Sequence, residues 1–220
     1  MGRIILTIAG PWSKAPALKT EFETQFSPAD RELADDFVYV GRRADALDDR
    51  DINAVLAHQG LLQAAVDFES DAPGWAEKGI RLALDAVALG AVGIFVETAC
   101  KALVPQGVKG LNPRDSHNQF HFYVEVMGTG DLILTEGMQA FDLPEVGAAY
   151  TASNRETAQA AVVSMAAQMV CDRLKPVDGG VFRASESAPL YRVSRGQLSA
   201  EQTEDPYANP YAPWILNIDI

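Results

Sequence analysis

The sequence predicts a single α+β domain in which helices pack on one mixed, largely antiparallel sheet. Two blocks of alternating strand and helix patterns and a long hairpin pattern over residues 120–136 predict this class. The chain has 220 residues, 48% of them hydrophobic, so it can bury a sizeable core without disulfides or structural metal. A ferredoxin-like, internally duplicated arrangement is the favoured version of the fold.

The first half of the chain carries both strand and helix patterns. A helix is expected after Asp71, a plausible N-cap residue, because Trp75, Leu82 and Ala86 recur at helical spacing and Pro73 suits its first turn. Short apolar runs bounded by turn residues predict the strands. The other elements expected here are strands over 4–9, 37–40, 61–68 and 91–97, and helices over 13–26 and 52–59.

The second half begins with residues 105–118, which contain two prolines and two glycines and predict a loop. Phe120, Phe122, Val124 and Val126 then alternate with more polar residues, which indicates a strand that a Met-Gly-Thr-Gly-Asp turn leads back into a second strand. Further along the chain, a capping box formed by Ser153 and Glu156 predicts a buried helix over 154–174.

The C-terminal part differs in composition. Residues 1–175 are expected to form the α+β domain, and residues 176–220 an irregular extension that packs on it. Within this extension, strands are expected around residues 190–193 and over Trp-Ile-Leu-Asn-Ile at the end. A repeated Pro-Tyr-Ala within residues 205–213 favours extended, polyproline-like structure.

Charge restricts the classes of partner. The chain has 18 Lys and Arg against 30 Asp and Glu, a net charge of −12. Such a field repels nucleic acid and anionic membrane surfaces, so neither is expected as a partner. Residues 21–77 alone hold 14 acidic and 4 basic residues. A block of this kind is usually a solvated face, and the sharper alternative is a docking surface for a basic protein partner.

The two cysteines and the lengths of the apolar runs bear on the cellular compartment of the protein. Cys100 and Cys171 stand in apolar surroundings outside any CxxC pair, so both are expected to be core residues. The apolar run at residues 4–9 is shorter than a signal peptide requires, and the longest apolar stretch, 86–96, is about half a membrane span. We therefore expect a cytoplasmic protein of bacterial type.

Chemistry-bearing motifs are few. No phosphate-binding or nucleophile-elbow motif occurs, and the sequence indicates no cofactor. His117 and His121 have the spacing of a helical metal pair, but the predicted strand would separate their Cβ atoms by roughly 13 Å, so no metal site is expected. Cys100 has no histidine near it in sequence to act as a base. No catalytic residue can be named, and a non-catalytic protein is favoured over an enzyme.

Two classes of function remain. The favoured one is a protein-interaction module that binds a protein partner or itself through residues 21–77 and the Pro-Tyr-Ala tail. The alternative is a small-ligand-binding protein or enzyme with a pocket on the second face of the 120–136 hairpin. That pocket should gather five polar or titratable side chains into one concavity. The candidates are Glu97, His117, His121, Tyr123 and Glu136.

A T-x-G-hydrophobic-x-x-F-x-x-P-E pattern precedes the helix expected over 154–174. It is formed by Thr135, Gly137, Met138, Phe141, Pro144 and Glu145. Together with the Trp75 helix and the apolar strand after it, this part of the chain, about residues 60–175, resembles an uncharacterised bacterial family of unknown function. The resemblance implies an α+β fold and no activity. On the residues alone, the pattern is expected to be structural, with Glu145 capping a backbone group or pairing with Arg155.

Overall fold

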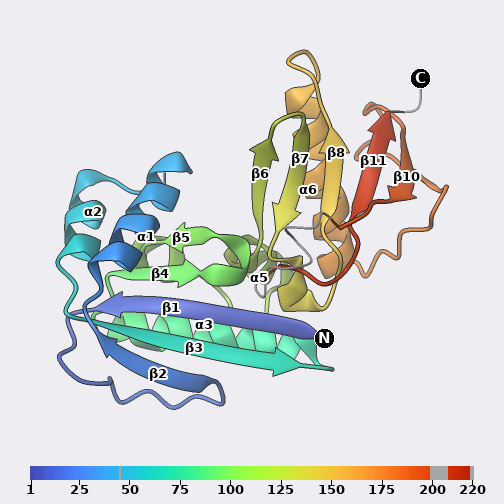
Figure 1. The fold of residues 1–220 in the computed structure, drawn as a ribbon. Helices are drawn as coiled ribbons and strands as arrows, with labels where there is room; N and C mark the ends of the chain where they lie inside the picture. Colours follow the sequence, from blue (N-terminus) through green and yellow to red (C-terminus); the bar gives the residue numbers. More distant parts are fainter. Residues whose placement is uncertain (45, 199–207, 219–220) are drawn as a thin grey trace.

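The chain folds into two β-sheets that share one hydrophobic core (Figure 1). The computed structural model describes residues 1–44, 46–198 and 208–218. The α+β class predicted from the sequence is confirmed, with two sheets in place of the one expected. The ferredoxin-like duplication is not confirmed, because the first sheet is antiparallel at each of its strand pairs and the second is mixed.

The first sheet has the strand order β2-β3-β1-β4-β5. Its strands are β1 (Gly2–Gly10), β2 (Glu23–Pro28), β3 (Gly60–Phe68), β4 (Gly93–Val96) and β5 (Lys101–Leu103). Helix α3 (Ala72–Ala88) lies along β1 on one face, where alternate residues Ile4, Leu6 and Ile8 are fully buried. The predicted cap of this helix is confirmed, since the Asp71 carboxylate accepts from the backbone N–H of Gly74.

Two helices near the β4–β5 side of this sheet form a smaller apolar cluster of their own. They are α1 (Arg31–Arg43) and α2 (Asp49–Leu56). The strand expected over 37–40 is wrong, because Asp30 caps α1 and these residues lie in its last turns. Phe37 and Val38 are buried on the inner face of the helix, so their apolar run reflects helix packing.

The helix expected over 13–26 is also wrong. Residues 23–28 form β2, which pairs with β3 so that Phe26 lies opposite Leu62. The residues before β2 form bends and irregular structure. Pro16 removes an N–H group from any helix that starts earlier, and sheet pairing then decides the conformation of the rest.

Helix α5 (Ser116–Tyr123) replaces the first part of the predicted hairpin strand. Asp115 caps it by accepting from the backbone N–H of Asn118, a local hydrogen bond that the alternating pattern did not reveal. A short helix, α4 (Pro105–Val108), also lies within the expected loop. The strand pattern starts only after the helix, with β6 (Glu125–Thr129).

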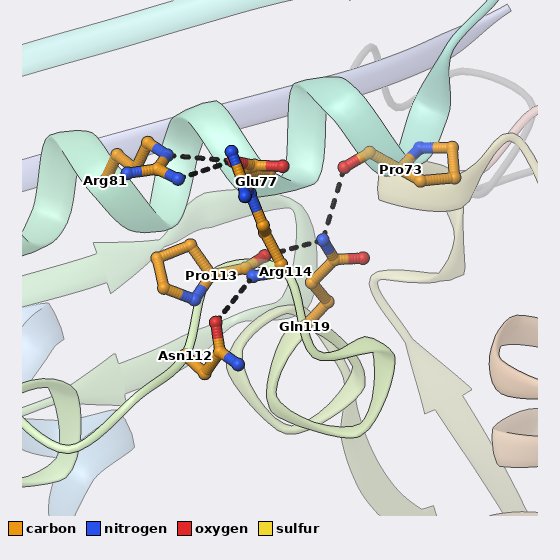
Figure 2. Close-up of polar contacts among 7 residues, drawn as sticks. All are labelled: Pro73, Glu77, Arg81, Asn112, Pro113, Arg114 and Gln119. Atoms are coloured by element: carbon orange, nitrogen blue, oxygen red, sulfur yellow. Dashed lines mark hydrogen bonds and ion pairs between the residues drawn. The ribbon is translucent and has the colours of Figure 1, made fainter.

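Gln119 joins α5 to the start of α3 (Figure 2). Its amide nitrogen donates to the carbonyl oxygens of Pro73 at 3.2 Å and Pro113 at 2.7 Å. Beside it, the Glu77 carboxylate accepts from both Arg81 and Arg114, as the dashed lines in Figure 2 show. These contacts fix the crossing point at which the chain passes from the first sheet to the second.

The second sheet has the order β6-β7-β8-β11-β10-β9. Beside β6, its strands are β7 (Leu132–Glu136), β8 (Val146–Ala149), β9 (Val181–Phe182), β10 (Tyr191–Arg195) and β11 (Trp214–Ile218). Strand β11 pairs in parallel with β8, so the last strand of the chain lies between two earlier ones. The strands expected near residues 190–193 and over Trp-Ile-Leu-Asn-Ile are confirmed. Of the Pro-Tyr-Ala segment, residues 205–207 lie outside the described residues.

Helix α6 (Arg155–Cys171) packs on β7 and β8, behind the second sheet in Figure 1. The long helix expected here is confirmed, but the capping box is wrong. The cap residue is Asn154, and its side-chain oxygen accepts from the backbone N–H and the hydroxyl of Thr151 instead of from the helix.

Candidate functional site

A cavity of about 400 Å³ lies where the end of the first sheet meets the second. One wall is the 3₁₀ turn η1 (Glu97–Ala99) with Cys100, which follows β4. The opposite wall is β7 with Met127 of β6, and a C-terminal segment at Ala208 and Asn209 completes it. Its volume lies in the range of small-molecule sites.

Glu97 enters the cavity wall from the end of β4. The hydroxyl of Thr7, a buried residue of β1, donates to its carboxylate at 2.5 Å. Thr7 faces the same side of the sheet as Phe95, its partner in the β1–β4 register, and Glu97 follows Phe95 by two residues. Glu97 is the first residue of η1, directly after β4, and this hydrogen bond from β1 fixes the position of its carboxylate.

Glu145 is a second carboxylate in the wall, with only 6% of its surface exposed. It accepts three hydrogen bonds: from the Thr135 hydroxyl at 2.6 Å, from the Met138 backbone N–H at 3.0 Å, and from the Asn209 amide at 2.8 Å. Thr135 in turn accepts from the backbone N–H of Val146 at 2.8 Å. This network holds the residue at the start of β8, the end of β7 and the C-terminal segment together.

Burial raises the pKa of Glu145 to about 7, even though these three donors each favour the charged form. The nearby Glu136 carboxylate adds to the rise, since a second negative charge disfavours ionisation. Glu145 is therefore a mixture of neutral and ionised forms near neutral pH. A cation bound in the cavity would shift that balance towards the ionised form.

Thr98 is the most unusual residue of the wall. Only 7% of it is exposed, and its hydroxyl has no hydrogen-bond partner among the described residues. A buried hydroxyl left unpaired destabilises a fold by about 1–3 kcal/mol. The hydroxyl oxygen itself is closed off from the cavity, so Thr98 lines the cavity with its other atoms.

Cys100 follows in a left-handed conformation with φ of +46°, which is rare for any residue except glycine, asparagine and aspartate. Burial raises the pKa of its thiol, and the Glu136 carboxylate raises it further. The thiol is therefore protonated at neutral pH and lacks the thiolate that nucleophilic chemistry requires.

The five residues predicted for a ligand pocket divide into two groups. Glu97 and Glu136 line the cavity together. His117 is 71% exposed, near Asp115, and His121 is exposed on α5. Tyr123 is fully buried and points towards α3, where its hydroxyl donates to the Ala76 carbonyl at 3.0 Å. The cavity is therefore lined from β7 and η1, and none of the three α5 residues lines it.

His117 and His121 lie one turn apart on α5, so the strand predicted to hold them far apart is wrong. Within the described ranges, however, no group of three or more His, Cys, Asp or Glu side chains is placed to hold a metal ion. His117 and His121 are therefore neighbours on one helix, and no third side chain among the described residues is placed to complete a metal site with them.

The pattern from Thr135 to Glu145 forms one wall of the cavity. Thr135, Gly137 and Glu145 all line it. Of the two alternatives expected for Glu145, it caps a backbone group, the Met138 N–H at the start of η2 (Met138–Phe141), and its other hydrogen bonds are to Thr135 and Asn209 in place of a pair with Arg155. Sequence reasoning had identified these residues as structural and missed Thr98 and Asn209 altogether. The alternation of Thr135 with the apolar residues of β7 was the available indication that its hydroxyl is buried.

The charged side chains in the described lining of the cavity are all acidic. Three glutamates line it, Glu97, Glu136 and Glu145, and its described lining contains no lysine, arginine or histidine. The remaining polar groups are hydroxyls, an amide and a thiol. An arrangement of this kind favours a ligand that carries positive charge.

Comparison of the chain with protein-family models, with curated proteins and with solved structures gave no match in any of the three. Over the described residues, no helix combines the length and apolar character that a membrane span requires. The function must therefore be inferred from the chemistry of the cavity.

Proposed function

We propose that this protein binds a small organic cation, carrying an ammonium or guanidinium group, in the cavity between η1 and β7. The observation that carries the proposal is the set of three carboxylates, Glu97, Glu136 and Glu145, in a wall whose described lining contains no lysine, arginine or histidine. A ligand with N–H donors would supply the positive charge that the glutamates favour, through charge-assisted hydrogen bonds.

The three glutamates would have different roles in binding. Glu97 and Glu136 are half-buried and would contact the cationic group, with Glu97 held in place by Thr7. Glu145 is deeper and already accepts three hydrogen bonds, so it would act through its charge. A bound cation would lower the pKa of Glu145, and binding at pH 7 would therefore release protons.

Binding without catalysis is the form of this function that the site supports. The Cys100 thiol is protonated, and the described lining of the cavity contains no histidine that could act as its base. Glu145 has a pKa suited to proton transfer, but its three hydrogen bonds are all to the protein itself.

Isothermal titration calorimetry with three hexyl compounds tests the proposal. We expect saturable binding of hexylammonium, and no binding of hexanol or hexanoate, because only the first carries positive charge. Replacing both half-buried glutamates, Glu97→Gln and Glu136→Gln, should weaken hexylammonium binding at least tenfold. The matched control is Glu69→Gln with Glu186→Gln, two exposed glutamates outside the cavity, which changes the net charge equally. Binding that is unchanged in the first pair, or lost equally in both, would contradict the proposal.

Docking of a basic protein surface on α1 is the second candidate, in line with the interaction module expected from the sequence. Tyr39 is 67% exposed, and it shares the outer face of the helix with Glu32, Asp35 and Asp36. Tyrosine is among the residues most often found as interface anchors, and the carboxylates beside it would attract a basic surface. Purifying tagged protein beside a variant with Asp35→Asn, Asp36→Asn and Tyr39→Ser tests this. A partner retained equally by both proteins would exclude this face.

We also propose a cytoplasmic location and no role in nucleic-acid binding. Both cysteines are free thiols, which suits a reducing compartment. The net charge of −12 opposes association with a polyanion. Fractionation of cells that express the tagged protein would test the first statement, and a gel-shift assay at low salt the second.

A further inference from the structure

A second cavity, of about 300 Å³, adjoins the first, and Cys100 and Met127 line both. It lies between the end of α1 and the outer edge of β6, which is the first strand of its sheet. Because the two cavities share two wall residues, they lie side by side.

The charges of the two cavities are opposite. The second contains two guanidinium groups, Arg43 from the end of α1 and Arg155 from the start of α6. Neither arginine belongs to an ion pair among the described residues. The second cavity holds one carboxylate, Glu125, and this group pairs with Lys101 at 3.5 Å. The arginines are therefore the charges that this cavity offers to a ligand.

Arg155 is exposed and lines the second cavity, and its place in α6 bears on what it can bind. It is the first residue of α6, where the positive end of the helix dipole disfavours a cation. The cap residue Asn154 makes no side-chain hydrogen bond to the helix, so the first N–H groups add to the positive potential there. The guanidinium lies over the ring of Tyr150, 5.6 Å from its centroid, which holds it in place. An anion at this point would be stabilised by both the side chain and the helix end.

Cys100 stands between the two sets of charges. Its thiol is close enough to both for Glu136 to raise its pKa and Arg43 to lower it. Its left-handed backbone, with φ of +46°, turns the chain at the wall that both cavities share. Strained backbone of this kind is concentrated at binding and catalytic sites.

We propose that the ligand is a small zwitterion, with its cationic group at the glutamates and a carboxylate at Arg43 and Arg155. This inference rests on the proposed function and adds the second half of the ligand. Amino acids with a basic side chain and ω-amino acids belong to this class. The carboxylate would be held by charge-assisted hydrogen bonds from the guanidinium groups, which suit its planar geometry.

Calorimetry with the full chain at pH 7 tests the proposal. The probes are ω-aminoalkanoates of four to eight carbons, each compared with the alkylammonium ion of the same length. At the length that spans both cavities, the aminoalkanoate should bind at least tenfold more tightly than its alkylammonium counterpart. Arg43→Gln and Arg155→Gln, made separately, should remove most of that advantage and leave alkylammonium binding within about twofold of the wild type.

Arg42→Gln is the matched control, since Arg42 is the neighbour of Arg43 on α1, is exposed and lines neither cavity. It should retain the full advantage. Equal affinity for the paired probes at every length would overturn the zwitterion and leave the cation site standing. If neither kind of probe binds, both this inference and the proposed function are wrong. An advantage that Arg42→Gln removes as fully as Arg43→Gln and Arg155→Gln would show a general charge effect and would also overturn the inference.

Discussion

The hydroxyl of Thr135 donates to the carboxylate of Glu145 across 2.6 Å, and both groups are buried. The same hydroxyl accepts from the backbone N–H of Val146, so its donor and acceptor capacities are both used. Through Asn209, the carboxylate also holds a segment 64 residues away in sequence. One buried carboxylate thus joins the cavity wall, the second sheet and the C-terminal part of the chain.

The raised pKa of Glu145 makes stability depend on pH. In the unfolded chain the group has the ordinary pKa of about 4.5, and in the folded protein about 7. Its stabilising contribution is therefore complete below about pH 4.5, falls as pH rises to about 7, and is constant above that. Replacing it with neutral glutamine removes this dependence. Urea unfolding at pH 4.5 and 7.5 should show the wild type losing up to about 3 kcal/mol more than Glu145→Gln. Parallel losses in the two proteins would contradict the raised pKa.

Thr98→Val should leave the free protein as stable as the wild type, or stabilise it by about 1 kcal/mol. The substitution replaces a buried, unpaired hydroxyl with a methyl group of nearly the same shape. In the same protein, hexylammonium should bind as in the wild type, because the hydroxyl is closed off from the cavity. Thermal unfolding and calorimetry measure the two effects. A large loss of stability would show that the hydroxyl has a partner within the chain.

Thr135→Val is the matched comparison, since it makes the same chemical change at a hydroxyl whose hydrogen bonds are all made. It leaves the Val146 N–H without its acceptor and removes one donor from Glu145. We expect it to destabilise the fold by about 1–3 kcal/mol. Urea unfolding beside Thr98→Val measures the contrast, and equal stabilities for the two variants would refute the assignment of the paired and unpaired hydroxyls.

Gly137→Ala should destabilise the protein by about 2 kcal/mol or more. Gly137 has φ of +104°, which alanine rarely adopts, and a Cβ atom there would lie 1.9 Å from the backbone oxygen of Tyr123. Gly130→Ala is the control, because it also has a positive φ but no atom within 4 Å of an added Cβ. In chemical denaturation, the second variant should lose distinctly less stability than the first.

Gly79→Ala should be destabilising although alanine favours helices by about 1 kcal/mol over glycine. Gly79 lies within α3, and a Cβ atom there would lie 2.0 Å from the Tyr123 hydroxyl oxygen. Tyr123→Phe removes that oxygen together with its hydrogen bond to Ala76. In a double-mutant cycle, the pair should therefore be more stable than the sum of the single changes indicates. Additive effects would contradict the contact.

Local patterns were sufficient for the elements whose sequence periodicity and packing agree. The helix after Asp71 was predicted because its apolar residues recur at helical spacing, the strand at residues 4–9 because it is a short apolar run bounded by turn residues, and the helix over 154–174 because it is long and rich in apolar residues. Local patterns failed at 37–40 and 120–123, where runs of four and eight residues fit either a strand or a helix period. In both places a capping aspartate, Asp30 or Asp115, favoured a helix.

The sequence by itself determined the α+β class, the acidic character of residues 21–77 and two of the cavity residues, Glu97 and Glu136. Only the tertiary structure decided that there are two sheets and that a cavity forms at their junction. It brings Thr98, Glu145 and Asn209 together from positions far apart in the chain. Periodicity reports which face of an element is buried, whereas a cavity depends on which elements meet. That outcome is decided by packing between distant segments.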